Sequence, residues 1–162
     1  MRSPTPPIIR QASGADAARL ARLRWDDSTE GGREIGQPFS QFCEDFAAFL
    51  VGALASGHWV VWLAEAEGEI VAHVYVRLIE MIPRPGRLGA RWGYAAAAYT
   101  VPERRNRGIG SQLLRRVIAW AEEERLETLV LWPSERSVPF YERAGFRRSL
   151  DVLELQLQGN AT

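Results

Sequence analysis

Apolar and polar residues recur along the chain with two different periods, which divide it into helices and strands. Apolar positions three and four residues apart predict four helices, at 17–23, 40–54, 108–125 and 137–144. Short apolar runs, several of them rich in β-branched residues, predict six strands, at 8–12, 58–66, 69–78, 92–101, 128–132 and 150–157. Helices and strands are therefore interspersed along the chain.

Two long stretches have neither period. Residues 25–38 mix acids, glycines and a proline, and residues 79–91 contain two prolines and two glycines. Long loops in a compact domain are usually functional or mobile, so we expect these two to carry the variable part of any binding site. Residues 1–7 are rich in proline and are expected to form a frayed tail.

Composition excludes several classes of function. The 162 residues suit one domain, and 46% apolar with 25% charged residues is typical of a soluble globular protein. Twenty acidic residues balance twenty basic ones, which disfavours a general nucleic-acid or membrane-surface protein. All the basic residues are arginine, so a Schiff-base lysine is excluded.

Cysteine usage and hydrophobic runs bear on the compartment. Cys43 is the single cysteine, so no internal disulfide can form, and we interpret it as a packed hydrophobe. No His/Cys cluster suggests a metal site. No apolar run is long enough to span a bilayer, and the N-terminus lacks the apolar core of a signal peptide. We therefore expect a cytoplasmic protein.

The stretch Tyr99–Ser111 has the order strand, proline, arginines with glycines, then helix. The first N–H groups of a helix lack internal partners and attract phosphate oxygens. Gly108 and Gly110 leave room for a ligand at the backbone, and the neighbouring arginines suit phosphate. This pattern predicts a binding site for a diphosphate.

Two common phosphate motifs fail here. A P-loop needs a lysine, which the chain lacks, and the third glycine of a dinucleotide fingerprint is replaced by Leu113. The remaining pattern, Arg105-x-x-Gly108-x-Gly110, resembles the [Q/R]-x-x-G-x-[G/A] signature of the GNAT superfamily of acyl-CoA N-acyltransferases. A second motif of that family, Y-x-x-x-G-F, is matched from Tyr141 to Phe146.

The resemblance spans residues 92–146 and implies an α/β fold. It implies one N-acetyltransferase domain over 1–162, with a mixed sheet of about six or seven strands, about four flanking helices, and a splay between the strands ending near Val101 and Trp132. It implies acetyl-CoA as co-substrate, no metal, an amine acceptor, and no nucleic-acid or membrane partner. Because members are often dimers, a homodimer is compatible with it.

The resemblance also implies a coenzyme site along one strand end and the helix after it. The Val101 amide would bind the thioester carbonyl, and Ser134 stands where many members have an asparagine that bonds the pantetheine arm. The implied coenzyme-binding residues are Tyr99, Thr100, Val101, Arg105, Asn106, Arg107, Gly108, Ile109, Gly110, Ser111 and Ser134. Arg104 is an alternative to Arg105 for the ribose phosphate.

Three residues are candidates for the chemistry. The resemblance implies that Tyr141 protonates the departing thiolate; the alternative is that its ring packs against Phe140. An alkyl amine with a pKa of about 10.4 must lose a proton before it attacks, and Glu80 or Glu135 is a candidate base. The alternative for both carboxylates is a solvated surface acid. We interpret His73, inside an apolar strand, as structural.

The acceptor site is expected in the two long loops, where an acidic cluster could hold a cationic amine. That cluster comprises Asp26, Asp27, Glu30 and Glu34. The leading hypothesis is an enzyme that transfers an acetyl group from acetyl-CoA to a primary amine. The alternatives are a catalytically inactive acyl-CoA sensor or interaction module, and an arginine-rich nucleic-acid binder that zero net charge disfavours.

Overall fold

The computed structural model describes residues 6–149 and 152–155, and the chain divides into two compact units, Met1–Trp132 and Pro133–Thr162. Each unit is described by itself. The first unit contains β1 (Ile8–Gln11), η1 (Gly14–Asp16), α1 (Ala17–Thr29), α2 (Phe39–Ala55), β2 (Trp59–Ala66), β3 (Glu69–Glu80), β4 (Arg91–Thr100), η2 (Pro102–Arg104), α3 (Ile109–Glu123) and β5 (Thr128–Val130). The second unit contains η3 (Glu135–Ser137) and α4 (Val138–Arg143).

The five strands of the described residues form one mixed sheet in the order β1-β2-β3-β4-β5. The pairs from β1 to β4 are antiparallel, and β4 pairs with β5 in parallel. Glu67 and Gly68 connect β2 and β3 with positive φ angles of 55° and 82°, as a tight two-residue hairpin turn requires. The predicted α/β fold with a mixed sheet is confirmed.

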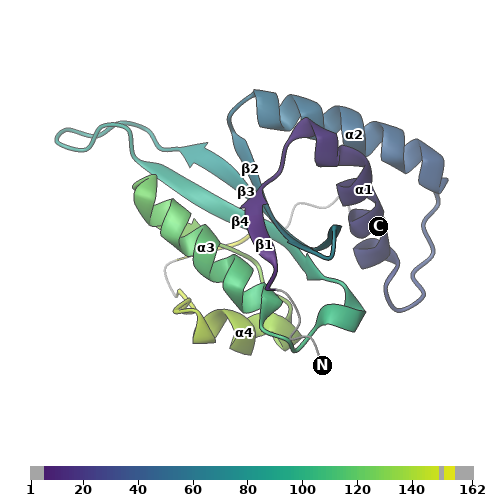
Figure 1. The fold of residues 1–162 in the computed structure, drawn as a ribbon. Coiled ribbons are helices and arrows are strands. Elements are labelled where there is room, and N and C mark those ends of the chain that lie inside the picture. Colours follow the sequence, from purple (N-terminus) through teal and green to yellow (C-terminus); the bar gives the residue numbers. More distant parts are fainter. Residues whose placement is uncertain (1–5, 150–151, 156–162) are drawn as a thin grey trace. The chain divides into compact units, whose positions relative to one another are not determined.

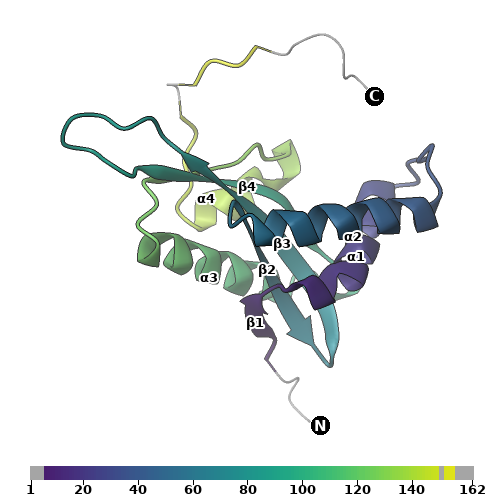
Figure 2. The ribbon, with the colours of Figure 1, turned by 90° about the horizontal axis from the view of Figure 1, so that it is seen from above.

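Helices cover both faces of the sheet in the first unit (Figures 1 and 2). Helix α3 packs Leu113 and Val117 against one face, which includes Val76. Helices α1 and α2 cover the other face, where Leu20 and Leu50 are fully buried. Each helix buries the apolar stripe that its period of three and four predicts.

Strand β5 pairs along its whole length, but only with the beginning of β4. Their partners run from Trp92 and Thr128 to Tyr94 and Val130, while β4 continues to Thr100. Beyond Tyr94 no described strand of this unit pairs with that edge of β4, which is the expected splay. The close approach where they do pair depends on Gly93, because an added Cβ would lie 2.6 Å from Leu129 Cδ2.

Helix α1 is longer than the sequence predicts. The loop expected from residue 25 begins after Thr29, because side-chain contacts and a hydrogen bond stabilise the last turn of the helix. The Trp25 ring contacts Phe39 with centroids 5.3 Å apart, and the Thr29 hydroxyl donates to the Trp25 carbonyl at 3.0 Å. This extra turn brings acidic residues that were expected in a loop onto the helix.

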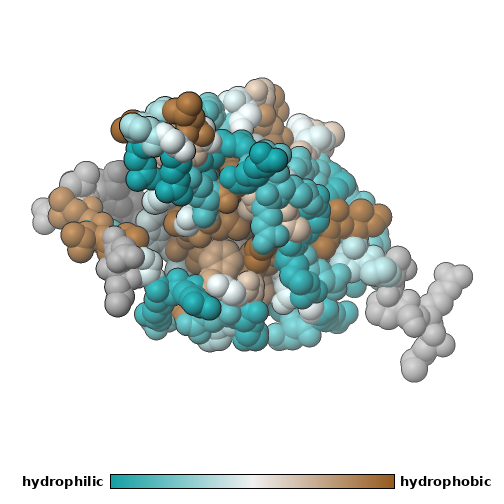
Figure 3. All heavy atoms as spheres, turned by 90° about the vertical axis from the view of Figure 1, so that its left-hand side faces the viewer, coloured by the Kyte–Doolittle hydropathy of each residue, from teal (hydrophilic) through white to brown (hydrophobic). Residues whose placement is uncertain are grey.

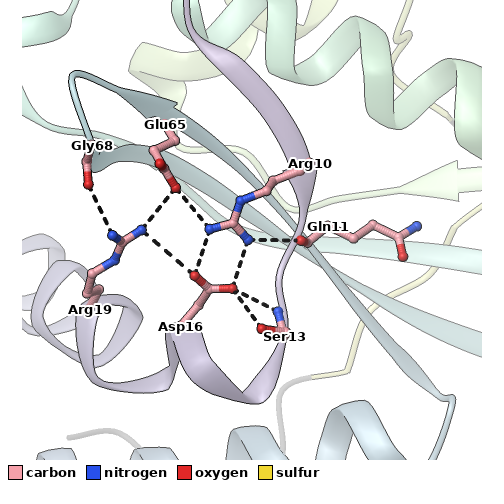
Figure 4. Close-up of polar contacts among 7 residues, drawn as sticks. All are labelled: Arg10, Gln11, Ser13, Asp16, Arg19, Glu65 and Gly68. Atoms are coloured by element: carbon pink, nitrogen blue, oxygen red, sulfur yellow. Dashed lines mark hydrogen bonds and ion pairs between the residues drawn. The ribbon is translucent and has the colours of Figure 1, made fainter.

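A buried carboxylate holds the start of α1 against the sheet (Figure 4). Asp16 is 5% exposed and accepts two hydrogen bonds from the Arg10 guanidinium, at 2.8 and 2.9 Å. Arg10 also bonds Glu65 of β2, at 2.9 Å, and Arg19 bonds the same carboxylate at 3.1 Å. The hydrogen bonds from Arg10 hold the pKa of Asp16 well below its usual range.

Half of the predicted strand at 150–157 lies outside the described residues, and the described half, 152–155, has no strand. The long connection between β3 and β4 exposes the hydrophobic side chains of Ile82 and Leu88. On the face shown in Figure 3, hydrophobic residues reach the surface near the centre and hydrophilic residues surround them.

Candidate functional site

The turn that leads into α3 has the backbone form of an anion site. Asn106 and Gly108 adopt left-handed φ angles of 59° and 76°. Gly108 is the N-cap of α3, and within the described residues no side chain caps this end. The first bond of the helix runs from the Gln112 amide to the Gly108 carbonyl at 3.0 Å, so the amides of Ile109, Gly110 and Ser111 have no acceptor inside the helix. These amides carry the positive end of the helix dipole.

The three arginines of this turn are not equivalent. Arg104 pairs with Glu67 in the β2–β3 turn. Arg105 binds Glu30 through two hydrogen bonds of 2.7 and 2.5 Å, which raise the pKa of the guanidinium. Arg107 is exposed and makes no ion pair with the described residues. The cation most available to a phosphate at this turn is therefore Arg107.

Strand β4 contains a bulge just before its end. His73 pairs with Tyr99 and Tyr75 pairs with Ala96, so two β4 residues lie opposite one β3 residue. Ala97 takes a left-handed φ of 49°, which is unusual for a residue with a side chain. Bulges often re-aim backbone groups beside active sites. The sequence did not predict this bulge; its one signal is the run of four alanines with poor strand propensity.

The backbone of Thr100 points away from β3. The Val101 amide donates to the Val71 carbonyl at 3.0 Å, and neighbouring residues of a strand point their backbone groups in opposite directions. Arg105 Nε donates to the Thr100 carbonyl at 2.8 Å from the other side. The expectation that the Val101 amide binds the thioester is therefore wrong, because the sheet already uses that amide. The Thr100 amide faces the edge of β4 that β5 leaves unpaired.

The register of β3 and β4 removes one candidate base. Ala72 pairs with Thr100, whereas Glu80 pairs with Arg91 at the opposite end of β4. Eight residues of strand separate Ala72 from Glu80, a distance of about 26 Å at the usual rise. Glu80 is exposed and is too far from Thr100 to act there, so that candidate is wrong.

The acidic residues around the end of α1 are largely neutralised. Asp26 accepts hydrogen bonds from Arg22 on both carboxylate oxygens, at 3.0 and 3.2 Å. Glu30 uses both of its oxygens on Arg105. Three members of the predicted acidic cluster, Asp26, Asp27 and Glu30, therefore form arginine–carboxylate pairs rather than an uncompensated negative patch.

The second unit explains the spacing of the Y-x-x-x-G-F motif. Gly145 has a φ of 99°, and the Phe146 amide donates back to the Tyr141 carbonyl at 3.1 Å. This closes α4 and brings the Phe146 ring to 5.7 Å from the Tyr141 ring. Phe140 packs on the same tyrosine at 5.1 Å. Burial raises the pKa of Tyr141, so the phenol keeps its proton at neutral pH.

The other two predicted residues of this unit are exposed. Ser134 precedes η3, and its hydroxyl donates to the Ser137 hydroxyl at 3.1 Å. Glu135 is in the first turn of η3. Their roles toward pantetheine and the acceptor amine stay predictions.

Within 6–149 and 152–155, no group of three or more His, Cys, Asp or Glu side chains is arranged to hold a metal ion. None of the helices in those ranges combines the length and apolar character that crossing a bilayer requires.

Comparisons with known proteins agree with this geometry. An aminoglycoside N(6')-acetyltransferase type 1 from Stenotrophomonas maltophilia is 32% identical over 121 residues, which is 72% of this chain and 69% of that protein. A predicted acetyltransferase from Clostridium acetobutylicum, solved with acetyl-CoA, superposes with a TM-score of 0.76 at 26% identity, over 93% of this chain and 96% of that one. A GCN5-related N-acetyltransferase from Ralstonia eutropha JMP134 gives a TM-score of 0.73 at 27% identity, over 93% and 98%.

A family model described as the acetyltransferase (GNAT) family matches residues 18–146. That range begins in α1 and ends at Phe146, so it contains the anion turn, the open edge of β4 and the tyrosine motif. The chain therefore belongs to the GNAT family of acetyltransferases.

Proposed function

We propose that this protein binds acetyl-CoA and transfers its acetyl group to a primary amine. The observation that carries the proposal is the start of α3, which no side chain of the described residues caps. A left-handed turn precedes it, and the edge of β4 beyond Tyr94 has no partner among the described strands. The helix amides and Arg107 match a diphosphate. The unpaired strand edge matches an extended arm that contains amides. The acetyl-CoA in the relative from Clostridium acetobutylicum supports the same assignment.

The residues divide between binding and chemistry. The amides of Ile109, Gly110 and Ser111 bind the pyrophosphate, and the unpaired edge of β4 holds the pantetheine arm, with Ser134 as a further donor. The Thr100 amide takes the place we first gave to Val101: it donates to the thioester carbonyl and stabilises the negative charge that develops there.

Tyr141 completes the reaction as the general acid. Its partly buried phenol keeps its proton at neutral pH and gives it to the thiolate of coenzyme A as the carbon–sulfur bond breaks. The Phe140 and Phe146 rings fix its orientation. The aminoglycoside acetyltransferase relative makes an aminoglycoside amine a sensible member of the acceptor panel.

Two measurements test the proposal. Calorimetry should detect acetyl-CoA binding, and release of free thiol from acetyl-CoA should accelerate in the presence of at least one amine of a panel. Binding without acceleration by any amine would favour the alternative, an inactive acyl-CoA-binding module. Absence of binding would refute both.

A further inference from the structure

Asp27 is the one carboxylate at the end of α1 that keeps an oxygen free. Arg24 Nη1 bonds its Oδ2 at 2.5 Å, and Oδ1 has no hydrogen bond within the described residues. Asp26 and Glu30, in contrast, use both oxygens on arginines. The Asp27 side chain is 28% exposed, so a ligand can reach it although it is partly desolvated.

Asp27 lies close to the end of β4. Helix α1 packs on both β3 and β4. Glu30, three residues after Asp27, bonds Arg105, and Arg105 Nε donates to the Thr100 carbonyl at 2.8 Å. After burial and Glu30, the charge of Asp27 is also among the causes that raise the pKa of Tyr99. Tyr99 immediately precedes Thr100, whose amide faces the unpaired edge of β4. The carboxylate is therefore within electrostatic range of the place where the proposed thioester is held.

Buried polar atoms without partners lie on β3, one of the strands on which α1 packs. In the described part of the chain, Tyr75 Oη and both ring nitrogens of His73 are buried and make no hydrogen bond. The two rings are 5.0 Å apart, and Asp27 is among the charges that raise the pKa of Tyr75, after burial. Buried polar atoms normally have a partner. Buried atoms of this kind are suited to an ordered water molecule.

His73 itself is a poor base. Its side chain is fully buried, and burial lowers its pKa to about 3, so its imidazole is neutral. Asp27 has the opposite perturbation, since burial raises the pKa of its carboxyl and Arg24 only partly opposes this. A carboxylate with a raised pKa is a stronger base than an exposed one.

We propose that Asp27 is the base that takes a proton from the acceptor ammonium, an inference that rests on the proposed function. The ammonium gives one proton to Asp27 Oδ1, and the neutral nitrogen attacks the thioester carbon. The carbon–nitrogen bond forms, the carbon–sulfur bond breaks, and Tyr141 protonates the thiolate. The second proton of the nitrogen restores the Tyr141 phenol, and the proton on Asp27 passes to water. The charged and titratable groups around Asp27 are Arg24 and Asp26 of α1, Glu30 after it, Tyr75 of β3, Tyr99 of β4, and Arg105. On β3, the neutral His73 lies beside Tyr75.

The test compares Asp27→Asn with the wild type on two amines. One is an alkyl amine with a pKa of about 10, and the other has a pKa below the assay pH and is already neutral. With the alkyl amine we expect kcat/KM to fall about 100-fold, a usual contribution of general base catalysis. With the neutral amine the loss should be less than about fivefold, because no ammonium proton must be removed.

Two variants and one binding measurement complete the design. Asp27→Glu should recover part of the activity on the alkyl amine, because it restores a carboxylate. Glu123→Gln, in a comparable arginine pair on the exposed side of α3, should leave kcat/KM unchanged. Calorimetry should give the same acetyl-CoA affinity for Asp27→Asn as for the wild type, which shows that the variant is folded.

Three results would overturn the role of Asp27. These are an unchanged kcat/KM in Asp27→Asn, an equal loss on both amines, and a raised amine KM with unchanged kcat. The last result would make Asp27 an anchor for the ammonium instead of a base. If the wild type itself bound no acetyl-CoA or acetylated no amine, the proposed function would fail, which is a distinguishable outcome.

Discussion

Replacing Asp16 by asparagine should lower the free energy of unfolding by about 2–3 kcal/mol. The change removes the charge from a side chain that is 7% exposed and that accepts two bonds from Arg10 and one from the Ser13 amide at 2.9 Å. Hydrogen bonds to charged groups contribute about 1.5–3 kcal/mol, and a lost partner leaves the arginine under-compensated. Arg10 still bonds the Glu65 carboxylate in this variant, which limits the loss of unfolding free energy.

Thermal and urea unfolding measure this effect. For a chain of this length, 2–3 kcal/mol corresponds to a fall in Tm of about 4–12 °C. Asp26→Asn is the matched control, because its pair with Arg22 is exposed on the same helix and should contribute less than about 1 kcal/mol. A double-mutant cycle with Arg10→Met isolates the coupling between the two side chains.

The pH dependence gives an independent check on the same carboxylate. The pKa of Asp16 is lowered in the folded protein, so its stabilisation is complete above the usual aspartate range, at about pH 4 and higher, and is lost as the pH falls toward the lowered value. The stability difference between wild type and Asp16→Asn should therefore shrink below about pH 4. A difference below about 0.5 kcal/mol at neutral pH would refute this reasoning about the network.

Three further changes probe the coenzyme site and the sheet. Gly108→Ala places a side chain at a φ of 76°, so it should cost about 1–2 kcal/mol in thermal unfolding and weaken acetyl-CoA binding in calorimetry; equal affinity would argue against the α3 turn as the anion site. Tyr141→Phe should reduce kcat about 100-fold with unchanged acetyl-CoA affinity, and full turnover would exclude the general-acid role. Gly93→Ala should destabilise the fold by about 1–3 kcal/mol in urea unfolding, because the new Cβ would lie 2.6 Å from Leu129 Cδ2; wild-type stability would show that β5 moves freely.

Short-range pattern was enough for most of the fold and for the coenzyme motif. The apolar period placed α2, α3 and the strands β1 to β4 close to their observed bounds. The order of strand, glycines and helix predicted the uncapped start of α3. These features depend on residues near one another in the chain, and local backbone sterics and helix periodicity are set at that range.

Tertiary packing decided what the local pattern could not. Trp25 contacts Phe39 and Phe42 of α2, which stabilises the last turn of α1 where the composition predicted a loop. The pairing of β3 with β4 moved Glu80 away from the site and left Thr100 rather than Val101 facing the unpaired edge. A shift of one residue in a strand reverses the direction of its backbone groups, and no one-dimensional pattern specifies that register.

The sequence by itself determined that this chain carries a glycine-containing helix start, of the kind that suits an anion, and a tyrosine motif of one enzyme family. Only the folded structure decided which carboxylates use both oxygens on arginines. It also decided which one keeps an oxygen free. Arg105 and Glu30 are 75 positions apart, and Arg24 and Asp27 meet only because α1 continues past Trp25. Ion pairing depends on distances in space of a few ångströms, whereas the sequence gives only separations along the chain.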